Sequence, residues 1–203
     1  MRKEASLKKG VNTKTLAKVG VLSAVAAVIM ILEFPLPFAP SFYKLDFSEI
    51  PVLIGAFALG PMAGIAIEFI KILLNFVLKG TITAGVGEIG NFLIGCSLVV
   101  PAAMIYRKNK TFKNAIVGLI VGIFSLAIVG AILNYFVLLP VYSTALGAPL
   151  QSFVDMGNII NKYIVDLKTL VLYAVVPFNL VKGILVSAMT ILIYKKLSPI
   201  LHR

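Results

Sequence analysis

The sequence predicts an all-α, polytopic membrane protein with six transmembrane helices and both termini in the cytoplasm. Of its 203 residues, 60% are hydrophobic and 13% are charged, whereas a soluble domain carries about 25% charged residues. The apolar residues form runs that approach the roughly 20 residues a helix needs to cross a bilayer. The basic residues gather mainly between these runs. We therefore expect a single integral membrane domain over residues 1–203.

Prolines, glycines and charges mark the ends of six apolar segments. The first follows a basic tail and extends to Leu32, which is long for a secretory signal, and no small-residue cleavage pattern follows, so we interpret it as a retained span. Pro51 suits a first helical turn, Gly60 and Pro61 separate two spans, and Pro140 is expected to end the fifth. The remaining stretch, 141–170, is expected to be an outer loop with a short helix over 157–170. The predicted spans are residues 16–34, 50–60, 62–78, 88–106, 114–140 and 175–195.

The distribution of basic residues sets the predicted orientation. Thirteen of the 19 lysines and arginines lie in the N-terminal tail, the 107–113 loop and the C-terminal tail, against four in the connections on the other side. Cytoplasmic segments carry such an excess in membrane proteins. The net charge of +11 is therefore explained by membrane topology, and we expect lipid and no nucleic acid around the protein.

Two polar residues stand out in the last span. Asn179 and Lys182 are three residues apart, so they share one helix face, and a lysine inside a span costs roughly 2.5–3.5 kcal/mol on insertion scales. Asn179 could instead form a cap or an interhelical hydrogen bond. Lys182 could snorkel towards the interface or pair with an acid such as Glu88. We interpret both residues as ligand contacts at the outer level of the membrane.

Further polar candidates lie at the same outer level. The amide of Asn134, in span five, offers a donor and an acceptor together, which suits the imide edge of a heterocycle; a helix–helix hydrogen bond is the alternative. Glu88 and Asn91 open span four within a glycine-rich segment that favours close helix packing. In span three, Glu68 and Lys71 have the spacing at which they can neutralise each other.

The outer loop over residues 34–51 is stiffened by prolines yet strongly apolar. A solvated loop would be polar, so we expect this one to fold down as a lid, with packing on the protein's own surface as the alternative. Asp46 and Ser48 are good capping residues for span two and are interpreted as structural.

Enzymatic motifs are missing from the sequence. Cys96 is the only cysteine and His202 the only histidine, so there is no internal disulfide, iron–sulfur cluster or thiolate zinc site. There is no metalloprotease motif, and the glycine-rich segment lacks the lysine of a phosphate-binding loop. We expect no catalysis, no ATP hydrolysis by this chain and no cofactor.

Three stretches resemble a known family: FPLPFAPSFYKLDFSEIPVLIGAFALGP at 34–61, GEIGNFLIG at 87–95 and VPFNLVKG at 176–183. The chain resembles the substrate-binding S components of energy-coupling factor (ECF) vitamin transporters, and among them the riboflavin-binding members. This implies a bacterial plasma-membrane protein that captures riboflavin at the outer face. It also implies partners, namely a transmembrane coupling protein and two cytoplasmic ATPases that drive uptake.

The resemblance also implies roles for particular residues. Polar contacts to the flavin ring would come from Asn134, Asn179 and Lys182, and the ribityl chain would lie near Asn91, Glu88 and Lys79. The apolar cover would include Leu36, Phe42 and Tyr43. Gly20 and Ala24 match the family's small-residue motif for the coupling protein, with glycine where the family has alanine. The alternatives are an S component for another vitamin, a standalone secondary transporter, which the lack of an inverted repeat disfavours, and an intramembrane enzyme.

Overall fold

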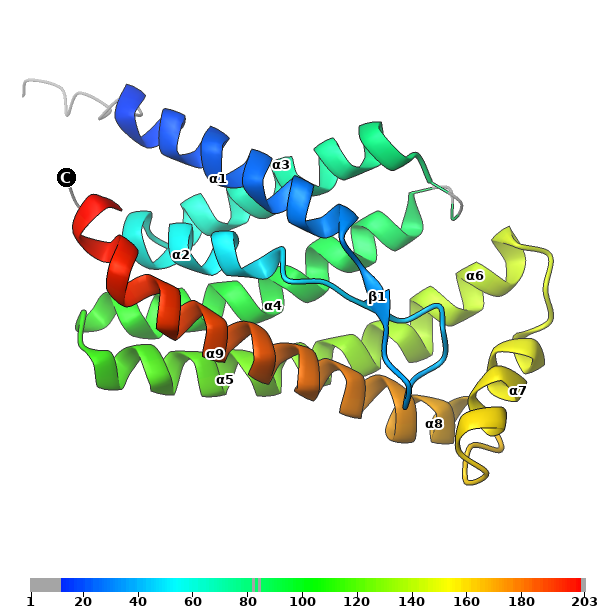
Figure 1. Ribbon diagram of the computed structural model, residues 1–203. Coiled ribbons are helices and arrows are strands. Elements are labelled where there is room, and N and C mark those ends of the chain that lie inside the picture. Colours follow the sequence, from blue (N-terminus) through cyan, green and yellow to red (C-terminus); the bar gives the residue numbers. More distant parts are fainter. Residues whose placement is uncertain (1–11, 82, 84, 202–203) are drawn as a thin grey trace, which may run out of the picture.

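The structure, a computed structural model, describes residues 12–81, 83 and 85–201, with the backbone alone at 195–201. It is a bundle of long helices that run side by side, with the connections gathered at its two ends (Figure 1). The N-terminus of α1 and the C-terminal part of α9 lie at the same end. The predicted orientation also depends on Arg2, Lys3, Lys8, Lys9 and Arg203, which lie outside the described residues, and on the side chains of Lys195 and Lys196, which are likewise not described.

Most helices begin close to their predicted positions. Asn12 caps the first helix, since its side chain accepts a hydrogen bond from the backbone N–H of Lys14, and Thr111 caps α5 through Asn114. The helices are α1 (Thr13–Ile31), α2 (Glu49–Leu59), α3 (Pro61–Lys79), α4 (Val86–Lys108), α5 (Phe112–Leu133), α6 (Leu139–Ala145), α7 (Leu150–Ile160), α8 (Leu167–Leu170) and α9 (Val176–Leu201), with π-helices η1 (Asn134–Leu138) and η2 (Val171–Val175).

The last two long helical segments exceed the predicted spans. Helix continues through Pro140 to Ala145, and the final segment begins at Leu167, so the predicted end near Pro140 and start near residue 175 were wrong. Pro140 lies two residues after the end of the π-helix η1 and stands in the first turn of α6. A proline lacks a backbone N–H, and a π-helix shifts the hydrogen-bond register, so the chain passes the proline without ending the helix. The connection between α6 and the final helical segment contains α7, and the segment itself begins with the short α8, in place of the one helix expected over 157–170.

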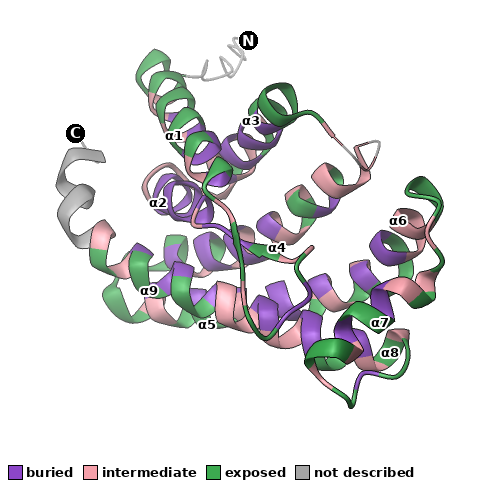
Figure 2. Cartoon of the chain, turned by 45° about the vertical axis from the view of Figure 1, so that its right-hand side comes forward, coloured by how far each residue is buried: buried purple, intermediate pink, exposed green. Residues whose placement is uncertain are grey.

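The helix α2 is the shortest member of the bundle core. Its 11 residues span only about 16 Å at 1.5 Å per residue, against a hydrocarbon layer of roughly 30 Å. It is buried on nearly all sides, as the purple ribbon in Figure 2 shows, and its Leu53 and Val52 are fully enclosed. Five helical segments in the described part of the chain are long and apolar enough to cross a membrane. The six-span count therefore stays a prediction.

Candidate functional site

The loop between α1 and α2 folds against the bundle through a short hairpin. Strand β1 (Phe34–Pro35) pairs antiparallel with β2 (Lys44–Leu45). Leu45 and Ala39 are buried against Phe178 of α9, and the loop aromatic Phe42 meets Phe153 of α7 edge to face, with ring centroids 5.5 Å apart. The loop thus packs on the protein's own helices near the start of α9, and its role as a lid stays a prediction.

Asn134, the first residue of η1, and Asn179 of α9 both lie beside Gly130 of α5. Asn134 is 2% exposed and Asn179 is 5% exposed. The Asn134 amide donates to the carbonyl of Gly130 at 2.8 Å, and the Asn179 amide donates to the carbonyl of Val175 at 3.0 Å. A Cβ on Gly130 would lie 2.6 Å from Nδ2 of Asn179, so the absence of a side chain at Gly130 lets Asn179 approach α5 beside the carbonyl that Asn134 uses.

Tyr43 of the loop reaches this pair of asparagines. Its hydroxyl donates to Oδ1 of Asn134 at 2.8 Å, and its ring lies 5.6 Å from that of Phe178. Burial raises the pKa of the Tyr43 phenol well above its usual value, so the group remains a neutral donor. The family resemblance implied that Tyr43 belongs to the apolar cover, but its hydrogen bond to Asn134 was not predicted.

Lys182 pairs with Asp46 of the loop, with 2.9 Å between Nζ and Oδ2. Both side chains are largely buried, at 14% and 7% exposed. The acidic partner of Lys182 is therefore Asp46 and not Glu88. Because this partner is buried, Lys182 does not need to snorkel towards the interface. Burial by itself raises the pKa of Asp46, but the charges of Lys182 and Lys71 outweigh it and hold that pKa well below its ordinary range.

Asp46 is the site residue that sequence reasoning missed. It was interpreted as a cap of span two, and one of its oxygens does accept a hydrogen bond from the Ser48 backbone N–H at 2.8 Å. Ser48 itself makes no side-chain capping bond. A carboxylate beside the start of a helix can act as a cap or form an ion pair. The only sequence signal for the ion pair was the lysine at 182, which had no evident partner.

A cavity of about 20 Å³ lies under the Lys182–Asp46 pair. It is lined by both of these residues, by Ser48, Glu49, Lys71 and Asn91, and by the apolar Met30, Ile94, Gly95 and Leu126. Asn91, a predicted ligand contact, therefore does approach Lys182 across this cavity. The volume suits about one water molecule.

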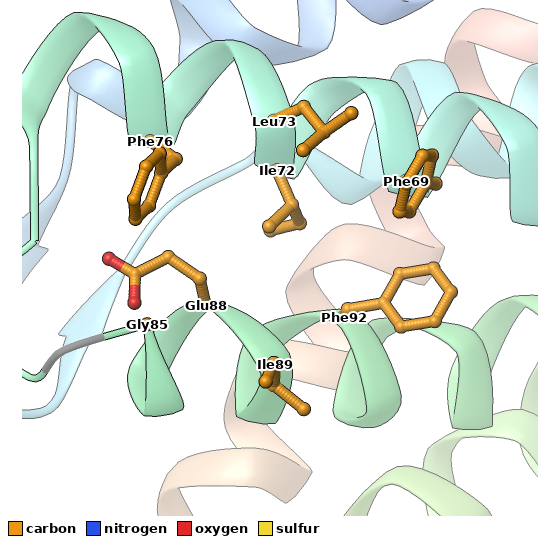
Figure 3. A pocket seen from close by; sticks show the side chains of 8 residues that line it. All are labelled: Phe69, Ile72, Leu73, Phe76, Gly85, Glu88, Ile89 and Phe92. Atoms are coloured by element: carbon orange, nitrogen blue, oxygen red, sulfur yellow. The ribbon is translucent and has the colours of Figure 1, made fainter.

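A larger hollow of about 300 Å³ lies between α3 and α4, and Figure 3 shows the side chains that line it. Its walls are Phe69, Ile72, Leu73, Phe76, Gly85, Glu88, Ile89 and Phe92. Glu88 is its only charged residue and accepts a hydrogen bond from Thr81 at 3.1 Å. Two of the lining side chains, Ile89 and Phe69, are at least half exposed. This hollow is an apolar groove on the bundle surface, and the polar candidates other than Glu88 do not line it.

The remaining predicted residues are placed apart from the asparagines. Lys79 donates to Glu33 at 2.7 Å, and Lys44 donates to the same carboxylate at 3.0 Å, so Lys79 ties the end of α3 to the loop. Leu36 packs with the cluster around Phe178. Gly20 and Ala24 are exposed on α1, as a surface for another helix requires. Ligand contact by Glu88 or Lys79 stays a prediction.

Comparison with known proteins assigns the class of this bundle. The model of the ECF transporter substrate-specific component matches residues 14–194, nearly the whole described chain. The protein belongs to this family, and it is a multi-pass membrane protein.

Individual members of the family are similar to this chain over nearly its whole length. The chain is 38% identical to the riboflavin transporter RibU of Staphylococcus aureus, over 95% of this chain and 94% of that protein. It is 36% identical to the riboflavin transporter FmnP of Bacillus subtilis, over 93% and 94%. A solved S component of a bacterial ECF transporter superposes with a TM-score of 0.73 at 37% identity, covering 94% of this chain and 99% of that one.

Proposed function

We propose that this protein is the riboflavin-binding subunit of an ECF-type uptake transporter, and that Asn134, Asn179 and Lys182 hold the flavin ring. The observation that carries the proposal is that one apolar loop contacts two of these side chains, Asn134 through Tyr43 and Lys182 through Asp46. The names of the relatives support the choice of vitamin.

The chemistry of the three side chains suits a flavin. The isoalloxazine ring is flat and apolar on its faces, and its imide edge carries both donors and acceptors. Two amides can each donate and accept, whereas a lysine only donates, so together they match such an edge. Tyr43, Phe42 and Phe178 supply aromatic surface beside them. Asn91 approaches Lys182 across the small cavity and is a candidate for the ribityl chain.

Binding requires the loop over residues 32–48 to shift. The cavity next to Lys182 measures about 20 Å³, whereas pockets for ligands of this size measure about 300–1,000 Å³. The loop side chains Tyr43 and Asp46 occupy the hydrogen-bonding groups of Asn134 and Lys182. We infer that the flavin replaces these two loop contacts and that the loop then closes over it.

Transport by this subunit needs an energy source outside it. The described residues include no nucleotide-binding motif, and the family is a transporter component. We infer that a transmembrane coupling protein and two cytoplasmic ATPases supply the work. The exposed small residues Gly20 and Ala24 of α1 would contact the coupling protein.

Purification from riboflavin-rich medium tests the vitamin assignment. We expect yellow protein whose flavin fluorescence is quenched. Colourless protein that fails to quench added riboflavin, yet binds thiamine or biotin, would move the chain to another vitamin.

Single substitutions test the site. Lys182→Ala and Asn179→Ala are expected to weaken riboflavin binding at least tenfold, because one buried polar contact is worth about 1–3 kcal/mol and 1.4 kcal/mol is a factor of ten. Fluorescence titration of the purified variants measures this. Lys110→Ala and Asn114→Ala, at the opposite end of the bundle, are matched controls and should bind normally. Normal binding by both site variants would disprove the assignment.

A further inference from the structure

A second cluster of charges lies deeper in the bundle than Lys182. Nζ of Lys71 in α3 is 2.8 Å from Oε1 of Glu49 in α2 and 2.7 Å from Oε1 of Glu68 in α3. All three side chains are at most 4% exposed. A side chain on Gly95 of α4 would collide with the carboxylates of both Glu68 and Glu49, so the two acids lie against the same point of α4.

A shared cavity connects this cluster to the ion pair between Lys182 and Asp46 of the loop. Lys71 and Asp46 line the same cavity as Glu49 and Lys182, and Asp46 holds Lys182 at 2.9 Å. Five ionisable side chains from α2, α3, α9 and the loop therefore form one buried network. The surfaces facing it from α1 and α5 are apolar or small within the described residues, and α4 adds Asn91 and the half-buried thiol of Cys96.

The charges of this network do not balance. It contains three carboxyl groups, Asp46, Glu49 and Glu68, but only two amines, Lys71 and Lys182. With every group ionised, one negative charge would remain in the interior of a membrane bundle. Burial of an uncompensated charge costs several kcal/mol, and such a group usually changes its protonation state instead.

Within the part of the chain that the structure describes, buried oxygen atoms of the network lack hydrogen-bond partners. Oε2 of Glu68, Oε2 of Glu49 and Oγ of Ser48 are all buried and have no hydrogen-bond partner among the described residues. Glu49 and Ser48 line the cavity of about 20 Å³. Buried polar atoms are nearly always paired, and a carboxylate cannot donate to another carboxylate. The Ser48 hydroxyl carries a donor of its own. One added proton on a carboxyl group supplies a donor between the two glutamates and the missing positive charge at once.

We propose that this network binds one proton at neutral pH, held on Glu68 as a neutral carboxylic acid beside the ionised Glu49. Glu68 is the carrier because it lies in the middle of α3 and is 0% exposed. Glu49 is the first residue of α2, where the helix dipole stabilises a negative charge. The site is a proton site of the bundle core and does not depend on which vitamin the protein binds.

Infrared spectroscopy of the purified full-length protein tests this directly. A protonated carboxylic acid has a carbonyl stretching band that ionised carboxylates lack and that shifts in D₂O. We expect this band in the unmodified protein at neutral pH and its loss in Glu68→Gln. Glu88→Gln, the same chemical change on α4 outside the network, should keep it. A protein without the band, or a band that survives Glu68→Gln, would overturn the proposal.

A second variant tests the charge balance without touching the bundle core. Asp46→Asn leaves two carboxyls facing two amines, so Glu68 is expected to ionise and the band to disappear, although residue 46 belongs to the loop. Persistence of the band in Asp46→Asn would overturn the charge-balance argument. If Glu68→Gln fails to fold, Asp46→Asn still tests the proposal.

The pH dependence of stability gives an independent readout. An ordinary glutamate of the unfolded chain is ionised at neutral pH, so the folded protein would bind one proton more than the unfolded chain. Stability must then fall as pH rises through neutrality. We expect the melting temperature to fall across this range in the unmodified protein and to be flatter in Glu68→Gln. An equal slope in both proteins would contradict the proposal.

Discussion

At the scale of the residue, the site is defined by loop side chains that use the polar groups of the helices. The Tyr43 hydroxyl donates a hydrogen bond to the side-chain oxygen of Asn134, and the Asp46 carboxylate forms an ion pair with Lys182. The polar positions Asn134, Asn179 and Lys182 could be singled out from the sequence because polar groups are costly in a span, and their contact with a ligand stays a prediction. Their loop partners could not, since a tyrosine and an aspartate are unremarkable in a loop.

Removal of the Tyr43 hydroxyl is expected to change stability and affinity in opposite directions. Tyr43→Phe keeps the ring but leaves Oδ1 of Asn134 without its donor. The protein should melt at a lower temperature without riboflavin and bind riboflavin roughly two- to tenfold more tightly, because a hydrogen bond contributes about 0.5–1.5 kcal/mol. Thermal melting and fluorescence titration measure the two effects. Weaker binding would show that the hydroxyl contacts the flavin rather than competing with it.

At the scale of the element, the helices were well predicted and their ends less so. Apolar runs and basic ends located α1, α3 and α4 to within a few residues. The segment through Pro140 was cut short because proline normally ends a helix, and the π-helix η1 that accommodates it has no sequence signature. The same π-helix begins at Asn134, so the irregular turn and the candidate ligand contact coincide.

The close packing of α5 on α9 at Gly130 predicts that a larger residue there weakens riboflavin binding. Gly130→Ala places a methyl group against the Asn179 amide, so we expect riboflavin affinity to fall at least tenfold while the protein remains folded. Gly20→Ala is the matched control, because a Cβ there meets nothing within 4 Å. Circular dichroism checks the fold and fluorescence titration the affinity. Equal affinities in the two variants would mean that Gly130 does not position Asn179.

At the scale of the whole molecule, the N-terminus of α1 and the C-terminal part of α9 lie at one end of the bundle, and the loop that carries β1 lies toward the other end (Figure 1). This arrangement suits cytoplasmic termini and a site open to the outside, which the distribution of basic residues predicts. The family was predictable from short strings such as KLDFSEIP. The buried charge network was only partly predictable: the spacing of Glu68 and Lys71 was informative, but Glu49 joins them through tertiary packing alone.

Thiol labelling tests the orientation. In a Cys96→Ala background, Lys162→Cys lies in the connection predicted to be outside and Lys110→Cys in the loop predicted to be cytoplasmic; both lysines are exposed. A membrane-impermeant maleimide added to intact cells should label the first protein and leave the second unlabelled until the cells are opened. The reverse pattern would invert the topology.

The shortness of α2 has a further consequence. Since α2 reaches only about half of the way through the hydrocarbon layer, the half of the bundle predicted to be outer lacks one helix, and the loop between α1 and α2 fills that place. A loop held by a two-residue hairpin and a few side chains can swing aside while every long helix stays in position. Vitamin entry would therefore need no separation of the long helices, and the bundle could stay sealed to ions while its outer end opens.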